Sequence, residues 1–204
     1  MNVQTPSRPR KSEITRAQLI DAAHRVFARE HYQNARITDI CAEAGKANGV
    51  FYRYFTNKED IFSACFEQFL ADLRESSPPA EAFDEDLPTA IRAATRVYWD
   101  KYVSYYGVVT GLFEAGISDP EIARMWRRVR HRGVRQFAHR IALQQEAGRC
   151  AHLDPEIAAS ALMCMFEFSC YNWMSQRIDL VRENVDPEVA IENLYQMIAR
   201  ILEI

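Results

Sequence analysis

Residues 36–55 read RITDICAEAGKANGVFYRYF, and this stretch decides the fold of the N-terminal part of the chain. Its first apolar residues share one face of a short helix that we expect to end at Ala44: Ile37, Ile40 and Cys41. Gly45 follows, and glycine suits the left-handed backbone position that ends many helices. After about three residues a second short helix is expected. Two short helices around a tight, glycine-containing turn are typical of a helix-turn-helix.

The second helix of this pattern is predicted to begin near Ala47 or Asn48. Four apolar residues can form its packing stripe: Val50, Phe51, Tyr54 and Phe55. Four others are left for its outer side: Asn48, Gly49, Tyr52 and Arg53. In a helix-turn-helix the second helix enters the major groove of DNA, so this outer side is the predicted reading surface.

The residue types on this surface suit nucleic acid. Arg53 can donate two hydrogen bonds to guanine or clamp a phosphate, and Asn48 can bond a phosphate or a base edge. Gly49 lets the backbone approach the sugar-phosphate surface, and Tyr52 offers a hydroxyl to a phosphate. Lys58 adds a cation at the start of the next helix, where backbone N–H groups also favour an anion.

From about Thr15 to Phe69 the sequence resembles the tetracycline-repressor (TetR) family of transcriptional regulators. The most specific pieces are Asp39-Ile40, Ala44-Gly45, Gly49, Phe51-Tyr52-Arg53-Tyr54-Phe55 and Asn57-Lys58-Glu59-Asp60-Ile61-Phe62. The resemblance implies a homodimeric regulator, most simply a repressor, that binds a pseudo-palindromic double-stranded operator and responds to a small molecule. The predicted DNA contacts are Arg36, Thr38, Lys46, Ala47, Asn48, Gly49, Val50, Tyr52, Arg53 and Lys58.

Two departures from the family pattern affect these contacts. Arg36 stands where the family often has a Thr or Ser that caps the first motif helix; Arg36 cannot cap, but it can reach phosphate. Lys46 and Ala47 replace an apolar residue and a hydroxyl residue after Ala44-Gly45. The second helix therefore loses its usual hydroxyl cap, at a cost of about 0.5–2 kcal/mol unless Asn48 or water substitutes.

The rest of the chain is predicted to be all-α. The 204 residues are 48% apolar and 26% charged, the mix of a globular protein, and no alternation of period two is visible. We expect about nine helices: three in an N-terminal DNA-binding domain over residues 1–57, and six in an effector-binding and dimerisation domain over residues 58–204. The first helix is expected over about residues 12–30 and the fourth over about 58–74.

Three later helix starts share one chemistry: Asp119-Pro120-Glu121, Asp154-Pro155-Glu156 and Asp186-Pro187-Glu188. In each, the Asp can cap free backbone N–H groups, the Pro fits the first turn, and the Glu meets the positive end of the helix dipole. Asn57 with Asp60 is predicted to be another cap. Residues 75–80, ESSPPA, with the acidic stretch to Asp86 are predicted to form a linker.

Large rings and methionines are frequent in the second half. Most belong to a helical core, but so many can also line an adaptable apolar cavity. In the resembled family such a cavity holds the inducer, which predicts a mainly hydrophobic or aromatic effector, oriented by Tyr hydroxyls or by Glu114 or Glu167. The predicted lining residues are Trp99, Tyr102, Tyr106, Phe113, Trp126, Phe137 and Phe166.

Residues 122–145 contain seven arginines and no acidic residue. This run is either a solvated helix face or, as the sharper alternative, a site for an anionic ligand that depends on Arg127 or Arg128.

The last two helices, about residues 155–177 and 187–203, carry more apolar surface than one small bundle needs. The resemblance implies that they pair with the same helices of a second subunit. Their apolar residues are Ala158, Leu162, Met165 and Phe166 with Ser169, then Val189, Ile191, Leu194, Tyr195, Ile198 and Ile201.

The sequence gives less support to functions other than DNA-binding regulation. The chain has no HExxH, GxSxG, P-loop or GxGxxG motif, and its histidines lack metal-ligand spacing, so we expect neither an enzyme nor a cofactor nor a metal site. Five cysteines without CxxC spacing are expected to be reduced and mostly buried, with a thiol-oxidation switch as the alternative mode of regulation. A small-molecule carrier that ignores DNA is a further alternative. No secretory signal or membrane span is expected, which favours the cytoplasm.

Overall fold

The computed structural model describes residues 11–117, 119–176 and 185–204, and in these ranges it contains helices and no strands. The all-α prediction is therefore confirmed. The helices are α1 (Lys11–Asn34), α2 (Ile37–Glu43), α3 (Asn48–Phe51), α4 (Lys58–Ser76), α5 (Ala80–Glu85), α6 (Leu87–Ser104), α7 (Tyr106–Ala115), α8 (Pro120–Glu146), α9 (Pro155–Cys170) and α10 (Pro187–Ile201). A π-helical turn, Tyr171–Gln176, continues α9. The N-terminal residues 1–10 and the expected helix end at Arg177 lie outside the described residues.

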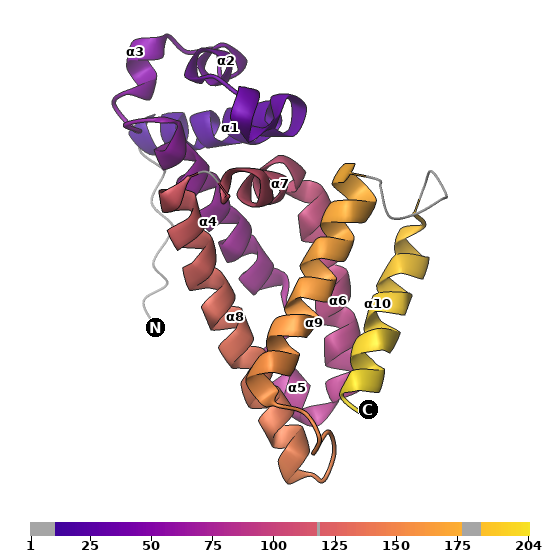
Figure 1. Ribbon diagram of the computed structural model, residues 1–204. Coiled ribbons are helices and arrows are strands. Elements are labelled where there is room, and N and C mark those ends of the chain that lie inside the picture. Colours follow the sequence, from indigo (N-terminus) through magenta and orange to yellow (C-terminus); the bar gives the residue numbers. More distant parts are fainter. Residues whose placement is uncertain (1–10, 118, 177–184) are drawn as a thin grey trace, which may run out of the picture.

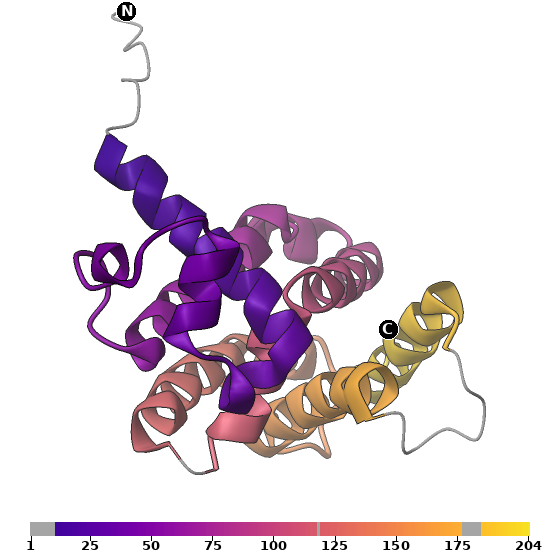
Figure 2. The same ribbon diagram turned by 90° about the horizontal axis from the view of Figure 1, so that it is seen from above.

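The first three helices form a layer at one end of the molecule. Figure 1 shows α2 and α3 on the side of α1 that faces away from the body, and α4 leading from this layer into the bundle. The body consists of α4 to α10. Seen from above, α10 lies at the edge of the bundle, away from α1–α3 (Figure 2). The helix-turn-helix is thus presented at the end of the molecule opposite the tip of the bundle.

Every predicted aspartate cap is present. The Asp119 carboxylate accepts hydrogen bonds from the N–H groups of Glu121 and Ile122, at 2.8 and 3.2 Å. Asp154 accepts from Ile157 at 2.9 Å. The same chemistry recurs at the starts of α10 and α4: Asp186 accepts from Glu188 at 2.9 Å, and Asn57 accepts from Asp60 at 2.8 Å. These side chains satisfy backbone donors that have no partner within the helix, and so fix where each helix begins.

The prediction of a linker up to Asp86 is wrong in its second half, since residues 80–85 form α5. Asp86 then caps α6 by accepting from the N–H of Thr89 at 3.1 Å. The acidic stretch is therefore a short connecting helix, which brings the described total to ten α-helices instead of about nine. The Arg140 guanidinium lies over the Phe83 ring at 4.3 Å and pairs with Asp84 at 3.2 Å. These contacts with α8 stabilise a segment that composition alone suggested was irregular.

A continuous hydrophobic core joins the N-terminal layer to the body. Phe27 of α1, Phe62 of α4 and Leu112 of α7 are almost fully buried in it. Gly107 of α7 makes this approach possible, because a Cβ there would lie 2.3 Å from the backbone nitrogen of Ala28. The crossing of α1 over α7 therefore requires glycine at this position.

A second cluster fills the far end of the body, where Ile141, Leu162 and Ile198 are buried. Helix α10 packs against α6, and ion pairs of Arg92 with Glu192 and of Arg96 with Glu188 flank that contact. Within the described residues, no helix has the length and apolar character needed to cross a membrane, and no group of His, Cys, Asp or Glu side chains could hold a metal ion.

Candidate nucleic-acid interface

The turn between α2 and α3 has the geometry that its sequence predicts. Gly45 has φ +64°, in the left-handed region. Its N–H donates to the carbonyl of Ala42 at 3.0 Å, and the next N–H, of Lys46, donates to the carbonyl of Cys41 at 2.9 Å. This pair of hydrogen bonds is the Schellman motif, which ends α2 and turns the chain toward α3.

Helix α3 is short and is held from beneath by aromatic side chains. Phe51 and Phe55 are buried, with ring centroids 5.6 Å apart, and the Arg16 guanidinium lies 5.2 Å from the Phe55 centroid. Ala47 precedes α3 and makes no side-chain cap, so the predicted loss of the hydroxyl cap is confirmed. Burial of the two rings therefore fixes α3 in place where a cap does not.

The predicted contact residues all lie at least partly on the surface of this layer. The Tyr52 side chain is 62% exposed, and its ring packs edge-on against the buried ring of Phe51. Six more are exposed: Arg36, Thr38, Ala47, Asn48, Gly49 and Arg53. Lys46, Val50 and Lys58 are half-buried. Among the described residues, no carboxylate pairs with Arg36, Lys46 or Arg53, which leaves these cations free for a phosphate or a base.

The start of α2 has a different cap from that of the family pattern. The Arg36 side chain makes no capping hydrogen bond, as expected. Instead Asp39 accepts from the backbone N–H of Arg36 at 3.2 Å, which is the reciprocal half of a capping box. The guanidinium of Arg36 therefore stays available for phosphate while α2 keeps a defined start.

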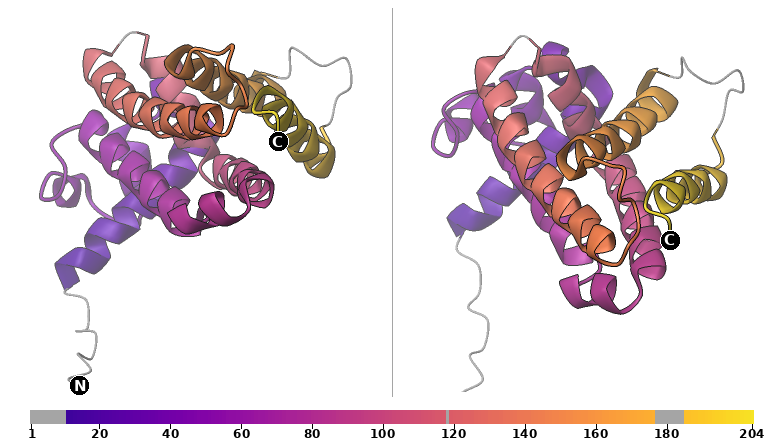
Figure 3. Two further views of the ribbon diagram at one scale, coloured as in Figure 1. Left: turned by 90° about the horizontal axis from the view of Figure 1, so that it is seen from below. Right: turned by 60° about the horizontal axis from the view of Figure 1, so that its bottom comes forward.

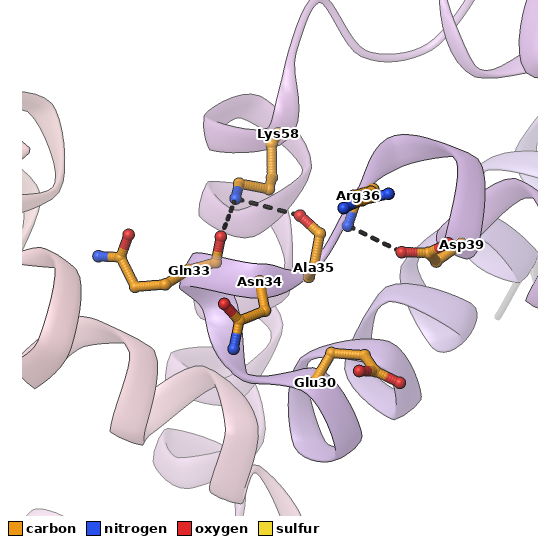
Figure 4. A pocket seen from close by; sticks show the side chains of 7 residues that line it. All are labelled: Glu30, Gln33, Asn34, Ala35, Arg36, Asp39 and Lys58. Atoms are coloured by element: carbon orange, nitrogen blue, oxygen red, sulfur yellow. Dashed lines mark hydrogen bonds between the residues drawn. The ribbon is translucent and has the colours of Figure 1, made fainter.

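Lys58 occupies a different environment from the one predicted. Its ammonium donates to the carbonyl of Tyr32 at 2.8 Å. It also donates to the carbonyls of Gln33 and Ala35 at 3.3 and 3.1 Å (Figure 4). It also lies 4.5 Å from the Tyr32 ring centroid, and burial lowers the pKa of the ammonium. All three ammonium donors are used inside the protein. The side chain of Lys58 thus ties the end of α1 to α4, which weakens the case for it as a phosphate contact.

A hollow lies beside Lys58, between the ends of α1, α2 and α4 (Figure 4). It is lined by Glu30, Gln33, Asn34, Ala35, Arg36, Asp39 and Lys58. Glu30 and Asp39 place two carboxylates on its wall, which disfavours an anion there. The hollow therefore shares Arg36 and Lys58 with the predicted DNA surface, but its carboxylates do not favour a phosphate inside it.

No sequence motif indicated the residues that connect this surface to the body. The imidazole of His31 lies 3.4 Å from the Glu114 carboxylate of α7, so Glu114 is engaged by α1 and not directed at a ligand. His24 of α1 lies edge-on to Tyr105, with ring centroids 4.9 Å apart, and within 3.3 Å of Gln68. The pair Gly107 and Gly111 in a short apolar helix was the one sequence signal for this close crossing.

The predicted effector residues are only partly brought together. Trp99 and Tyr102 are buried in the first core cluster, against which Tyr106, Phe113 and Trp126 pack. Phe137 belongs to the second cluster, and Phe166 borders both. Phe113 packs edge-on against Trp126 at 4.8 Å. Neither the hollow beside Lys58 nor a second surface hollow at Asp154–Ala161 is lined by these residues, so the effector site stays a prediction.

The second carboxylate offered for ligand orientation also has a partner. Glu167 is 6% exposed and forms an ion pair with Arg130 of α8. The same guanidinium lies 3.2 Å from the sulfur of Cys164. A ligand would have to displace this pair in order to use either charge.

The cysteines are mostly buried, as expected: Cys41, Cys65, Cys150 and Cys170 are buried and Cys164 is exposed. Burial raises the pKa of Cys170 to about 12 and also raises those of the other three buried thiols. Because the thiolate is the reactive form, these four are poor redox sensors.

The comparisons with known proteins agree with this geometry. A family model described as "Bacterial regulatory proteins, tetR family" matches residues 19–65, which contain α2, α3 and the start of α4. The N-terminal part of the chain, residues 19–65, thus matches the TetR family. A TetR-family transcriptional regulator from Rhodococcus sp. superposes with a TM-score of 0.72 at 17% identity, over 92% of this chain and 98% of that one. A fatty acid degradation regulator from Bacillus halodurans superposes with a TM-score of 0.70 at 19% identity, over 95% and 96% of the two chains. This likeness is one of fold.

Curated relatives match over shorter stretches. A nicotine-responsive transcriptional repressor of Paenarthrobacter nicotinovorans is 31% identical over 50% of this chain and 53% of that protein. The fatty acid metabolism regulator protein of Bacillus subtilis is 40% identical over 36% of this chain and 40% of that protein. The chain thus spans about half the length, or less, of these relatives in the aligned regions.

Proposed function

We propose that the protein is a homodimeric transcriptional repressor of the TetR family that binds a pseudo-palindromic DNA operator and is released by a small, mainly hydrophobic or aromatic effector. One observation carries the DNA-binding part: Asn48 of α3 and Tyr52 and Arg53 in the turn after it are exposed, while buried Phe51 and Phe55 anchor the same segment. Relatives named as repressors support the direction of regulation. No catalytic step is part of this function.

In this proposal α3 enters the major groove. Arg53 donates to guanine or phosphate, and Asn48 to a base edge or phosphate. Gly49 lets the backbone come close to the groove wall, because a Cβ there would meet nothing within 4 Å. Arg36 and Lys46 flank α3 and neutralise phosphates, which fixes the register on the duplex without reading sequence.

A two-fold dimer would present two copies of α3 about 34–36 Å apart, one turn of DNA. The surface that we propose for dimerisation is the outer side of α9 and α10, whose exposed apolar residues are Ile157, Phe168, Val189, Met197 and Ile201. Several residues predicted for that interface are instead buried inside this chain: Leu162, Ile191, Leu194, Tyr195 and Ile198. The proposed surface therefore keeps the two predicted helices, with Val189 and Ile201 from the predicted set, and adds Ile157, Phe168 and Met197.

The route from effector to DNA is proposed to run through α7, which packs under α1 at Gly107 and pairs Glu114 with His31. Phe113 on the same helix packs with Trp126 of α8. An effector releases DNA only through its different affinity for the two conformations. About 3 kcal/mol of such coupling would weaken operator binding roughly 150-fold. We also propose the division into a DNA-binding domain, residues 1–57, and an effector-binding domain, residues 58–204.

A competition binding assay with DNA from upstream of the protein's own gene tests this function. The purified protein should retard that duplex in the presence of excess random-sequence DNA, with two chains per site. A screen of hydrophobic and aromatic compounds should then find one that releases the duplex. Equal affinity for upstream and random DNA would contradict sequence-specific repression.

A further inference from the structure

Helix α8 differs in charge from the body that it covers. Between Glu121 and Glu146 it holds seven arginines and no acidic residue. The remainder of residues 56–204 holds nine Lys or Arg against 23 Asp or Glu, with Glu121 and Glu146 included. Such a contrast makes α8 a basic band on an acidic surface, a pattern that attracts polyanions to one place.

The basic residues of α8 gather on its solvent side. The exposed ones are Arg124, Arg127, Arg128, His131, Arg132, Arg135 and His139. At 100° per residue they span an arc of about 140°, and the buried Ile122 and Ile141 lie outside it. We call this set the arginine face. It extends over 16 residues from Arg124 to His139, or about 22 Å for the 15 steps of 1.5 Å between them.

Most guanidinium groups of the arginine face have no carboxylate partner. Arg130 and Arg140, which lie outside it, are paired with Glu167 and Asp84. Arg124 pairs with exposed Glu121 at 3.3 Å. In the described part of the chain, Arg127, Arg128, Arg132 and Arg135 have no ion pair. Four free guanidinium groups within about two helical turns cost free energy through mutual repulsion, and an anionic partner would remove that cost.

We propose that the arginine face of α8 binds the phosphate backbone of a second DNA duplex, separate from the one held by α3. Arginine forms bidentate hydrogen bonds with phosphate oxygens, and duplex DNA carries one negative charge per about 1.7 Å of its axis. The face is therefore long enough to meet several phosphates of one groove edge. The occupant is DNA on the strength of this charge complementarity.

The position of α8 excludes the operator itself as that occupant. Figure 1 shows α8 running from the α1–α4 end toward the opposite tip of the body, while α2 and α3 lie beyond α1. Figure 3 shows α8 and α9 side by side, so α9 covers one side of α8, and the arginine face is exposed to solvent on another. A duplex seated on α3 therefore lies beyond α1, away from the tip of the body toward which α8 runs. Arg127 and Arg128 are exposed and do not line an interior pocket. An anionic ligand that binds them would therefore bind on the surface of the protein.

The test separates the two DNA surfaces within the full-length chain. Asn48→Ala, Tyr52→Ala and Arg53→Ala together disable the α3 surface, and this triple variant is the background. The test variant adds Arg128→Gln and Arg135→Gln to this background. The matched control adds Arg74→Gln and Arg149→Gln instead, which change the charge equally at two exposed arginines elsewhere on the body. Fluorescence anisotropy with a random-sequence duplex is measured from 50 to 200 mM salt.

The triple variant should bind the random duplex with a steep salt dependence, and so should the triple variant that carries the control substitutions. The α8 substitutions should weaken binding at least about fivefold at 50 mM salt and reduce the slope of log K against log salt by about two. With an intact α3 surface, immobilised upstream DNA should retain a second labelled duplex, and the α8 substitutions should abolish that retention.

Two results would overturn the proposal: no binding of random duplex by the triple variant at 50 mM salt, or equal affinities of the α8 variant and its control. Preference for vesicles of anionic lipid over duplex would overturn DNA as the occupant. Failure of the α3 proposal is recognised separately, because the triple variant would then still prefer upstream DNA over random DNA.

Discussion

The Lys58 side chain joins two helices through three backbone carbonyls at the end of α1. These carbonyls follow His31, whose φ of 60° breaks the regular helix, so they lack partners within α1. Replacing Lys58 with Met keeps the stem and removes the three donors. The free energy of unfolding should fall by about 1–3 kcal/mol.

Urea unfolding followed by circular dichroism measures the Lys58→Met effect, and Lys46→Met on the exposed turn is the control, expected within about 0.5 kcal/mol of the parent. Equal stability of both variants and the parent would show that the ammonium does not hold α1 to α4.

The imidazole of His24 makes the stability of the N-terminal layer depend on pH. Burial is the main cause of its lowered pKa, and the Gln68 hydrogen bond opposes it. The unfolded chain therefore binds the proton first, near pH 6.5, so stability is full above this pH and falls as the pH drops toward the folded pKa. His24→Gln should lose less stability than the parent between pH 7.5 and 5.5 in urea titrations. The same loss in both proteins would contradict this assignment.

At the residue level, sequence patterns located the turn at Gly45 and every aspartate cap, because caps and turns depend on neighbouring residues. They could not locate the partners of Lys58, His31 or Glu167, since these contacts join residues distant in sequence and depend on how helices cross.

The crossing of α1 and α7 is the element on which the link between the two ends of the protein depends. A Cβ at Gly107 would meet the Phe27 carbonyl carbon at 2.4 Å, so Gly107→Ala forces the two backbones apart. We expect a loss of about 1–3 kcal/mol of stability. Gly49→Ala is the matched control, because its Cβ meets nothing, and it should keep the fold while weakening DNA binding.

Thermal unfolding together with operator binding separates the two glycine variants. A Gly107→Ala protein as stable as the parent would contradict the close crossing, and a Gly49→Ala protein with full DNA affinity would remove that residue from the interface.

At the element level, apolar periodicity predicted α1, α4 and α10 nearly to their bounds. Periodicity did not reveal α5, which was predicted to be part of a linker. This acidic six-residue helix has no apolar stripe of its own and is stabilised by Arg140 on another helix.

The whole molecule is expected to work as a pair. Ile157 and Phe168 are 71% and 48% exposed on α9, although both are large and apolar, and a partner subunit would cover them. Phe168→Glu should convert the dimer into monomers without unfolding the chain, as measured by sedimentation velocity. Ile117→Glu, at a 92% exposed residue between α7 and α8, is the control and should stay dimeric. A dimeric Phe168→Glu protein would place the interface elsewhere.

At this scale the pairing of the last two helices with a partner stays a prediction, but three of the side chains predicted for it, Ile191, Leu194 and Ile198, are turned toward the chain's own core. Only the packing of α10 against α6 decides that rotation.

The proposed function depends most on α3 as the surface that reads DNA. The most direct test is the ratio of affinities for upstream and random duplexes, measured by competition for the parent and for Arg53→Ala. The parent should prefer the upstream site, and Arg53→Ala should lose about 1–3 kcal/mol of that preference while keeping its fold. An unchanged ratio in a folded, dimeric Arg53→Ala protein would contradict base reading by Arg53, and no preference in the parent would contradict the account as a whole.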